Sequence, residues 1–62
     1  MTWSELERKL KRETKCRYIG EKKGHHEWIN SETGKTFTMG RHKSEQVPKG
    51  TLHSILKAAG LK

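Results

Sequence analysis

The chain has 62 residues and a formal net charge of +7 at pH 7, with 14 Lys and Arg against 7 acidic residues, none of them aspartate. A chain this short forms one domain at most, residues 1–62, and its core is marginal. Because it has one cysteine, it cannot form an internal disulfide. No apolar run approaches the length of about 20 residues that is needed to span a bilayer. Since no signal-peptide pattern is present either, we expect a cytoplasmic protein. The excess of positive charge predicts a polyanionic partner, with nucleic acid as the first candidate and an acidic protein as the second.

Residues 2–15 are predicted to form the first helix. Its apolar side chains recur at the spacing of one helical stripe: Trp3, Leu6 and Leu10. Two capping boxes compete to start it, Thr2 with Glu5 and Ser4 with Glu7. The other face carries Lys, Arg and Glu and is expected to be solvated.

The pattern then changes to short stretches rich in strand formers. Residues 16–20 are predicted to be a strand, residues 21–24 a turn in which Gly24 takes a positive φ, and His25–Asn30 a second strand. A polar loop of four or five residues that ends near Gly34 precedes a third strand, Thr36–Met39. Gly34 and Gly40 are both expected to be turn glycines.

The last segment, residues 49–62, again has helical spacing. Its apolar stripe is Leu52, Ile55, Leu56 and Ala59. Gly60 is expected just past the helix end, where it lets Leu61 fold back on Leu56. The order is therefore α-β-β-β-α, which predicts an α+β fold: a three-stranded antiparallel sheet with two helices packed on one face.

Alternation in the second strand decides which way its histidines point. Successive strand residues face opposite sides, which gives two sets: His25, Glu27 and Ile29 on one face, and His26, Trp28 and Asn30 on the other. Trp28 should face the helices, because it is large and apolar and because Glu27 is costly to bury. His25 is then exposed on the open face, and His26 is a partly buried packing residue. Ile29 is apolar and would favour the opposite orientation, with the face of His25 turned toward the helices. A bulge in this strand would also break the alternation.

An exposed histidine suits proton transfer, because imidazole has a reference pKa of about 6.5 and can act as a general base or acid near neutral pH. Two lysines precede His25, and the end of the third strand can return near the start of the second. The candidate phosphate-binding residues are therefore Lys22, Lys23, Arg41, His42 and Lys43. Their positive charge would hold a phosphate and stabilise the negative charge that builds during attack on it.

Simpler roles for these residues stay open. His25 and His42 can be ordinary surface residues, and His53 fits the polar face of the last helix. Cys16 fits a small buried apolar residue better than a nucleophile. A structural zinc site normally needs closely spaced pairs of ligands, which the chain lacks, and without aspartate a carboxylate-bound magnesium site would have to rest on glutamates alone. We expect no metal and no cofactor.

Four stretches resemble, in chain order, the HicA family of bacterial toxins: SELERKLKRET, KGHHEW, FTMGRH and VPKGTLHSILKAAGL. The resemblance extends over nearly the whole chain and is closest in GTLHSILKAAGL. It implies a fold like that of a double-stranded RNA-binding domain. It also implies a ribonuclease toxin that cleaves mRNA and is neutralised by a HicB antitoxin.

The family's active histidine lies in a Gly-Ser-His pattern at the start of the second strand. Lys23 stands here in the place of the glycine, Gly24 in that of the serine and His25 in that of the histidine. The resemblance therefore implies His25 as the catalytic residue. The stretch TMGRH is similar to a Thr-Val-Pro-x-His stretch of the family, with His42 retained and Gly40 in place of proline.

These observations favour a metal-independent endoribonuclease, the toxin of a toxin–antitoxin pair. In this hypothesis His25 takes the proton from a ribose 2′-hydroxyl, and the cations Lys22, Lys23 and Arg41 stabilise the transition state as the 2′-oxygen attacks the adjacent phosphate. An acidic HicB-type antitoxin would cover the same basic face. Two alternatives stay open: a non-catalytic RNA-binding module of the same fold, and a domain that meets only acidic proteins.

Overall fold

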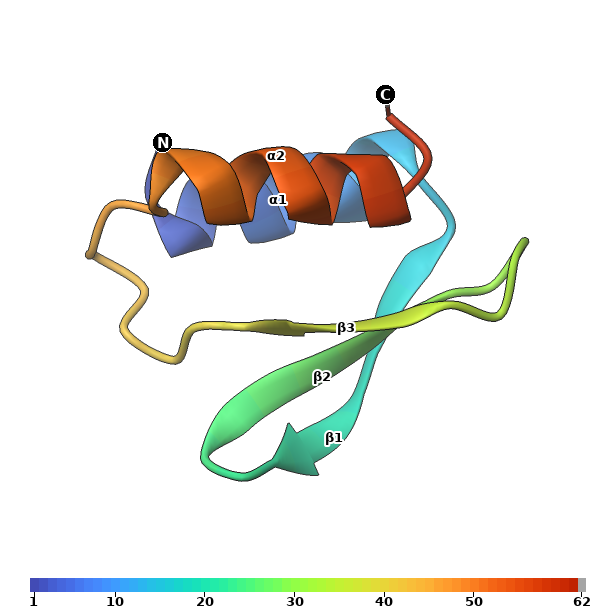
Figure 1. Cartoon of the computed structure of the whole chain (residues 1–62), viewed down its shortest axis with the longest axis horizontal. Helices are drawn as coiled ribbons and strands as arrows, with labels where there is room; N and C mark the ends of the chain where they lie inside the picture. The colour runs from blue at the N-terminus through green and yellow to red at the C-terminus, as the bar shows by residue number, and fades with distance from the viewer. Residues whose placement is uncertain (62) are drawn as a thin grey trace.

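The computed structural model describes residues 1–61; Lys62, the end of the predicted helical segment, lies outside them. The elements are α1 (Trp3–Glu13), β1 (Cys16–Lys22), β2 (His25–Asn30), β3 (Thr36–Met39) and α2 (Lys49–Ala58). The strands form one antiparallel sheet in the order β1-β2-β3, and the two helices lie side by side on one of its faces (Figure 1). The predicted α+β architecture is confirmed.

Helix α1 begins with the first of the two possible capping boxes. The Glu5 N–H donates to Thr2 Oγ1 at 3.2 Å, and the Thr2 N–H donates to Glu5 Oε1 at 2.8 Å. The hydrogen bond from the Thr2 backbone, with that from its side chain, lowers the pKa of the Glu5 carboxyl. The alternative box of Ser4 and Glu7 would start the helix two residues later, and it is not used.

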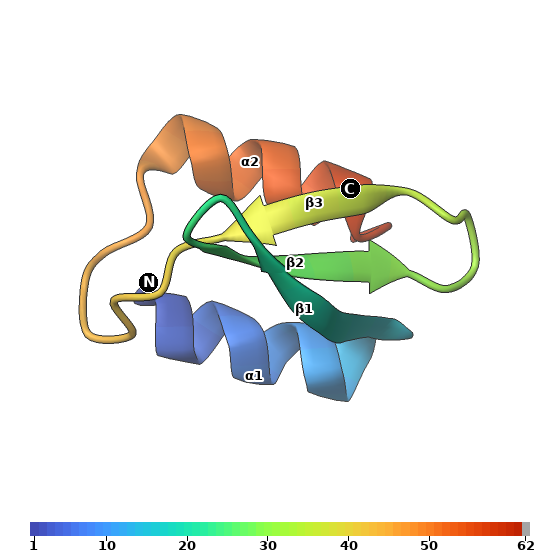
Figure 2. The same cartoon turned by 90° about the horizontal axis from the view of Figure 1, so that it is seen from below.

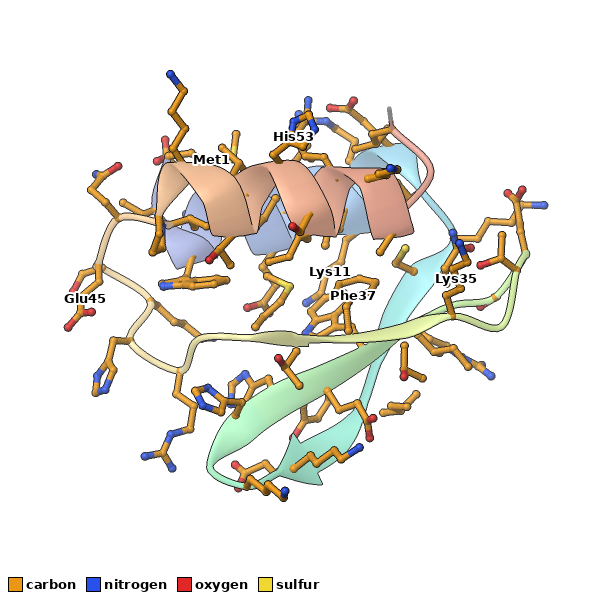
Figure 3. The ribbon with its side chains drawn as sticks, viewed as in Figure 1. Met1, Lys11, Lys35, Phe37, Glu45 and His53 are labelled. Atoms are coloured by element: carbon orange, nitrogen blue, oxygen red, sulfur yellow. The ribbon has the colours of Figure 1, made fainter. Side chains whose placement is uncertain are left out.

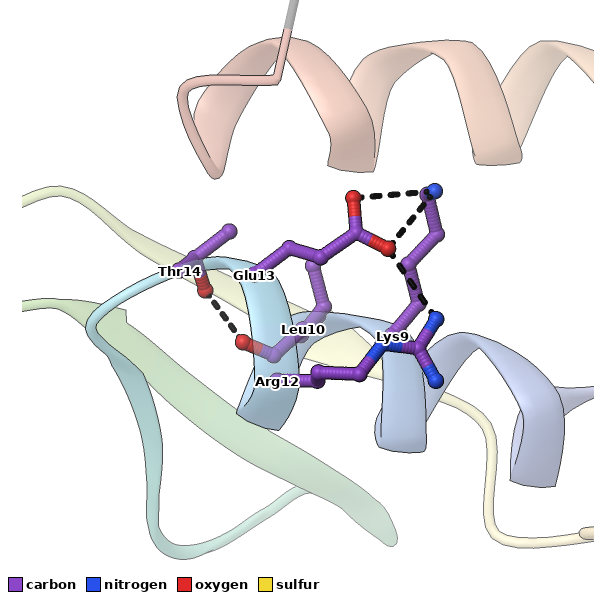
Figure 4. Close-up of polar contacts among 5 residues, drawn as sticks. All are labelled: Lys9, Leu10, Arg12, Glu13 and Thr14. Atoms are coloured by element: carbon purple, nitrogen blue, oxygen red, sulfur yellow. Dashed lines mark hydrogen bonds and ion pairs between the residues drawn. The ribbon is translucent and has the colours of Figure 1, made fainter.

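Helix α1 ends at Glu13, two residues before the predicted boundary. Thr14 has extended backbone angles, and its N–H donates to the Leu10 carbonyl at 3.0 Å. Its hydroxyl donates to the same carbonyl at 2.6 Å (Figure 4). Lys9 and Arg12 donate to the Glu13 carboxylate, and these hydrogen bonds lower the pKa of Glu13. The helix thus stops at a threonine that satisfies one of its last carbonyls.

Strand β1 is longer than predicted, because it continues through Lys22. Lys22 pairs with His25, so the connection to β2 is the two-residue turn Lys23–Gly24 and not the four residues 21–24. Lys23 has a φ of 49° and Gly24 a φ of 81°. Two positive φ values define a type I′ turn, whose twist matches that of the flanking strands and lets the pairing run up to the turn.

The sheet does contain a bulge, but it lies in β1, where the register shifts between Tyr18 and Gly20. Strand β2 therefore keeps its alternation, and Trp28 is only 1% exposed beneath the helices, as predicted. A bulge bends the strand that carries it. Tyr18 and Ile19, at this bulge, are about half exposed, at 49% and 46%.

The core lies between the helices and the sheet and contains both predicted helical stripes. Its buried residues are Trp3, Leu6, Leu10, Cys16, Trp28, Met39, Val47, Ile55 and Ala59, with Phe37, Leu52, Leu56 and Leu61 packed against them. Figure 3 shows Phe37 pointing from β3 toward the helices. At the end of α2, Gly60 has a φ of 87° and the Leu61 N–H donates to the Leu56 carbonyl at 2.9 Å, so the predicted helix end is confirmed.

Three segments far apart in the sequence meet at one end of the molecule. Figure 2 shows the β1–β2 turn, the beginning of α1 and the loop from β3 to α2 at this end, and the β2–β3 hairpin loop at the opposite end. The first residue of β2 and the residues after β3 are neighbours because β2 and β3 run antiparallel. His25 therefore lies close to the residues that follow β3.

Candidate functional site

His25 is the first residue of β2 and follows directly on the type I′ turn. Its side chain is exposed, and its cross-strand partner is Lys22. The next residue, His26, faces the helix side, where it pairs with the buried Met39. The regular alternation of β2 thus separates the two adjacent histidines into different environments.

A hollow of about 480 Å³ opens beside His25. Four of the sequence-predicted site residues line it: Lys23 and His25 from the β1–β2 turn and the start of β2, and Arg41 and His42 from the loop that follows β3. We call this hollow the His25 cavity. Beside two imidazoles it has two cationic residues, Lys23 and Arg41, against one acidic residue, Glu45, a balance that favours an anionic ligand.

Two predicted phosphate-binding residues do not line the His25 cavity. Lys22 lies one position before the turn, and its Nζ is 4.0 Å from Glu27 Oε2. A neighbouring carboxylate partly neutralises that ammonium group. Lys43 contributes its backbone carbonyl, which accepts from the Ser4 N–H at 3.1 Å. Both lysines belong to the surface around the cavity and not to its lining.

The loop that carries Arg41 and His42 is anchored to the beginning of α1. The first N–H groups of a helix have no partner within the helix. Here the Trp3 N–H donates to the Glu45 carbonyl and the Ser4 N–H to the Lys43 carbonyl, both at 3.1 Å. The loop also closes on itself, since the Glu45 N–H donates to the His42 carbonyl at 3.0 Å. The backbone on the C-terminal side of His42 is therefore held in place.

Gly40 fixes the same loop on the other side of His42. A Cβ built on Gly40 would lie 2.6 Å from Cε2 of the Trp3 indole and 2.8 Å from its Nε1. Gly40 does not have a positive φ, whereas Gly34 does, at 77°. The prediction of a turn glycine is thus confirmed for Gly34 and wrong for Gly40, where glycine is required by the close approach of the backbone to a core side chain.

A family model, that of the HicA toxin of bacterial toxin–antitoxin systems, matches residues 3–61. The chain belongs to the HicA toxin family. Searches of curated proteins and of solved structures found no match. Within residues 1–61 of this HicA toxin, neither helix is long and apolar enough to cross a membrane.

The other two histidines of this HicA toxin lie outside the His25 cavity. The ring of His26 is partly buried and meets the Tyr18 ring edge to face, with 5.2 Å between the centroids, so its predicted packing role is confirmed. His53 lies on the side of α2 that faces away from the sheet (Figure 3). Across residues 1–61, no three His, Cys, Asp or Glu side chains gather in a way that could hold a metal ion.

Sequence reasoning gave six of the residues that line the HicA toxin's cavity no role in the site: Trp3, Gly24, Gly40, Glu45, Gln46 and Pro48. Glu45, in the loop between β3 and α2 (Figure 3), and Trp3, from α1, both line it. Glu45 lies in the polar loop between β3 and α2, where apolar residues show no periodicity. The sequence therefore could not predict that Glu45 lies at the cavity. Trp3 was identified as a core residue, and nothing in the sequence indicates that a core residue also lines this cavity.

Proposed function

We propose that this HicA toxin is a metal-independent endoribonuclease that cleaves mRNA, with His25 as its general base. One observation supports this most: an exposed imidazole lies in one cavity with the cationic side chains of Lys23 and Arg41. Imidazole is the side chain best suited to accept a proton near neutral pH. Cations beside it suit the pentavalent phosphorus transition state, which carries more negative charge than the phosphodiester.

The reaction proceeds by attack of a neighbouring hydroxyl on phosphorus. His25, as neutral imidazole, takes the proton from the ribose 2′-hydroxyl while the 2′-oxygen forms a bond to the adjacent phosphorus. The bond between phosphorus and the 5′-oxygen breaks, which leaves a 2′,3′-cyclic phosphate and a 5′-hydroxyl end. Arg41 can donate two parallel hydrogen bonds to phosphate oxygens, and Lys23 supplies a second positive charge. A positioned base of this kind accelerates a reaction by roughly 10² to 10⁴.

RNA binding in this proposal rests mainly on phosphate contacts. Lys22 and Lys43 would contact the phosphates that flank the scissile one, in addition to Lys23, Arg41 and His42 in the cavity. Phosphate contacts carry no sequence information, and the open face of the sheet offers few aromatic side chains for base stacking. We therefore expect a weak sequence preference.

The partner in this proposal is an acidic antitoxin of the HicB type that binds over the His25 cavity. The net charge of +7 favours an acidic partner, and a protein seated on the cavity would exclude RNA from His25. Since mRNA is the target, we place the action of the toxin in the cytoplasm.

Incubation of the purified protein with a long RNA, with and without EDTA, tests this proposal. Cleavage that EDTA does not abolish supports the ribonuclease. RNA that is shifted on a native gel but stays intact would indicate a binding module of the same fold. RNA that is neither cut nor shifted would indicate a domain that binds only acidic proteins.

A further inference from the structure

The cleavage proposed above needs a second proton transfer, because the 5′-oxygen must leave. An alkoxide is about as basic as hydroxide, so an unprotonated 5′-oxygen is a poor leaving group near neutral pH. A general acid that protonates this oxygen is worth roughly as much as the base that activates the nucleophile, about 10² to 10⁴ in rate. A residue of the cavity that can give up a proton near neutral pH would serve as this acid.

Five ionisable side chains line the His25 cavity: Lys23, His25, Arg41, His42 and Glu45. A glutamate, with a reference pKa of about 4.3, has no proton to give near neutral pH, and lysine and arginine, whose reference pKa values are far above neutrality, hold theirs too tightly. His25 has the role of base. His42 is the other imidazole in the cavity, and imidazole is the side chain best suited to exchange a proton near neutral pH.

The position of His42 also suits this role. In phosphoryl transfer the attacking and leaving oxygens lie roughly in line through phosphorus, so base and acid must approach the phosphate from different sides. His25 is the first residue of β2 and His42 lies in the loop after β3, next to Arg41. The loop is held by Gly40 against the Trp3 ring and by the hydrogen bond from the Trp3 N–H to the Glu45 carbonyl. A catalytic group gains from such fixed positioning.

We propose that His42 is the general acid of the cleavage, an inference that rests on the proposed ribonuclease function. The imidazolium of His42 donates its proton to the 5′-oxygen as the bond from phosphorus to that oxygen breaks. In the same step His25 takes the 2′-hydroxyl proton and the bond from the 2′-oxygen to phosphorus forms. His25 ends protonated and His42 neutral, and exchange with solvent protons restores both.

A change of leaving group tests this assignment. A cleavage site is first mapped on a long RNA with the wild-type protein. The site is then built into two short oligonucleotides, one natural and one in which sulfur replaces the bridging 5′-oxygen. A thiolate leaves without protonation, because a thiol has a pKa of only about 8.5. We expect His42→Ala to slow cleavage of the natural substrate by about 10² to 10⁴ and to cleave the sulfur substrate at close to the wild-type rate.

The matched control is His25→Ala, which should slow both substrates, since the 2′-hydroxyl must be deprotonated in each. His42→Gln serves as a second variant, and circular dichroism checks the fold of all three. If His42→Ala slows cleavage of both substrates equally, His42 has a binding or structural role and the proposal is overturned. The proposal is also overturned if His42→Ala cleaves the natural substrate at a rate within threefold of the wild type. If the wild-type protein cuts no RNA at all, the proposed ribonuclease function itself fails, and the role of His42 fails with it.

Discussion

Gly40 lies against the indole ring of Trp3, so closely that any side chain on Gly40 would overlap that ring. The same tryptophan is part of the buried core, and its backbone N–H holds the Glu45 carbonyl. The loop that carries Arg41 and His42 is thus fixed by contacts with the beginning of α1 on both sides of these residues. The shape of the His25 cavity depends on a core residue that no functional motif contains.

We predict that Gly40→Ala lowers the free energy of unfolding by about 1 to 3 kcal/mol, the usual cost of overpacking. In a Trp3→Leu background the same substitution should cost less, because the ring that the Cβ meets is gone. Urea unfolding of the four proteins of this double-mutant cycle measures the coupling.

Gly50 provides the matched control, because a Cβ built there meets nothing within 4 Å. Gly50→Ala in the first turn of α2 should be neutral or slightly stabilising. An equal cost of Gly40→Ala with and without the Trp3 ring would refute the contact as the reason for this glycine.

We predict that the contribution of Glu5 to stability depends on pH. Its pKa is lowered in the folded state by the hydrogen bond from the Thr2 backbone N–H. The folded protein therefore binds fewer protons at this site than the unfolded chain, and stability rises with pH in this range. The contribution is complete above the unfolded pKa of about 4.3 and is lost as the pH falls through the lower, folded value.

Urea unfolding between pH 7 and pH 3 tests this. The difference in stability between wild type and Glu5→Gln should shrink toward acid. Glu7→Gln, which removes a carboxylate that makes no capping hydrogen bond with Thr2, controls for the lost negative charge. If the difference in stability between wild type and Glu5→Gln stays constant over this pH range, the ionised carboxylate of Glu5 does not stabilise the capping box.

The sequence predicted the periodic features of the fold. Two apolar stripes with helical spacing located α1 and α2, and alternation in β2 placed Trp28 beneath the helices and His25 on the exposed side. These predictions succeeded because one buried face imposes a period on the residues that line it. The bulge between Tyr18 and Gly20 left no comparable pattern, because it is set by the pairing of two strands.

The turn before β2 shows how a small error in an element changes a predicted site. A four-residue turn would have placed Lys22 and Lys23 in the same loop. In the two-residue turn Lys22 belongs to the β ladder near Glu27, and only Lys23 reaches the His25 cavity. The two-residue turn requires a positive φ at Lys23. A residue other than glycine rarely adopts a positive φ, so the sequence gives no sign of this conformation.

We predict that Arg41 makes a phosphate contact. The binding experiments use the His25→Ala background, which should leave RNA intact. In this background Arg41→Gln should weaken RNA binding and reduce the slope of log K against log salt concentration by about 0.7. This is the value for one phosphate contact to single-stranded nucleic acid. Lys9→Gln is the matched control, because Lys9 lies on α1, paired with Glu13, outside the cavity. Filter binding at several salt concentrations gives both slopes, and an unchanged slope for Arg41→Gln would exclude the contact.

The rate of RNA cleavage by His25→Ala tests the central claim most directly. The variant removes an exposed side chain, so its melting temperature should match that of the wild type, and His53→Ala serves as a histidine control on α2. We predict that His25→Ala cleaves at least about 100-fold more slowly than the wild type and that His53→Ala cleaves normally. Wild-type cleavage by a folded His25→Ala protein would contradict the account.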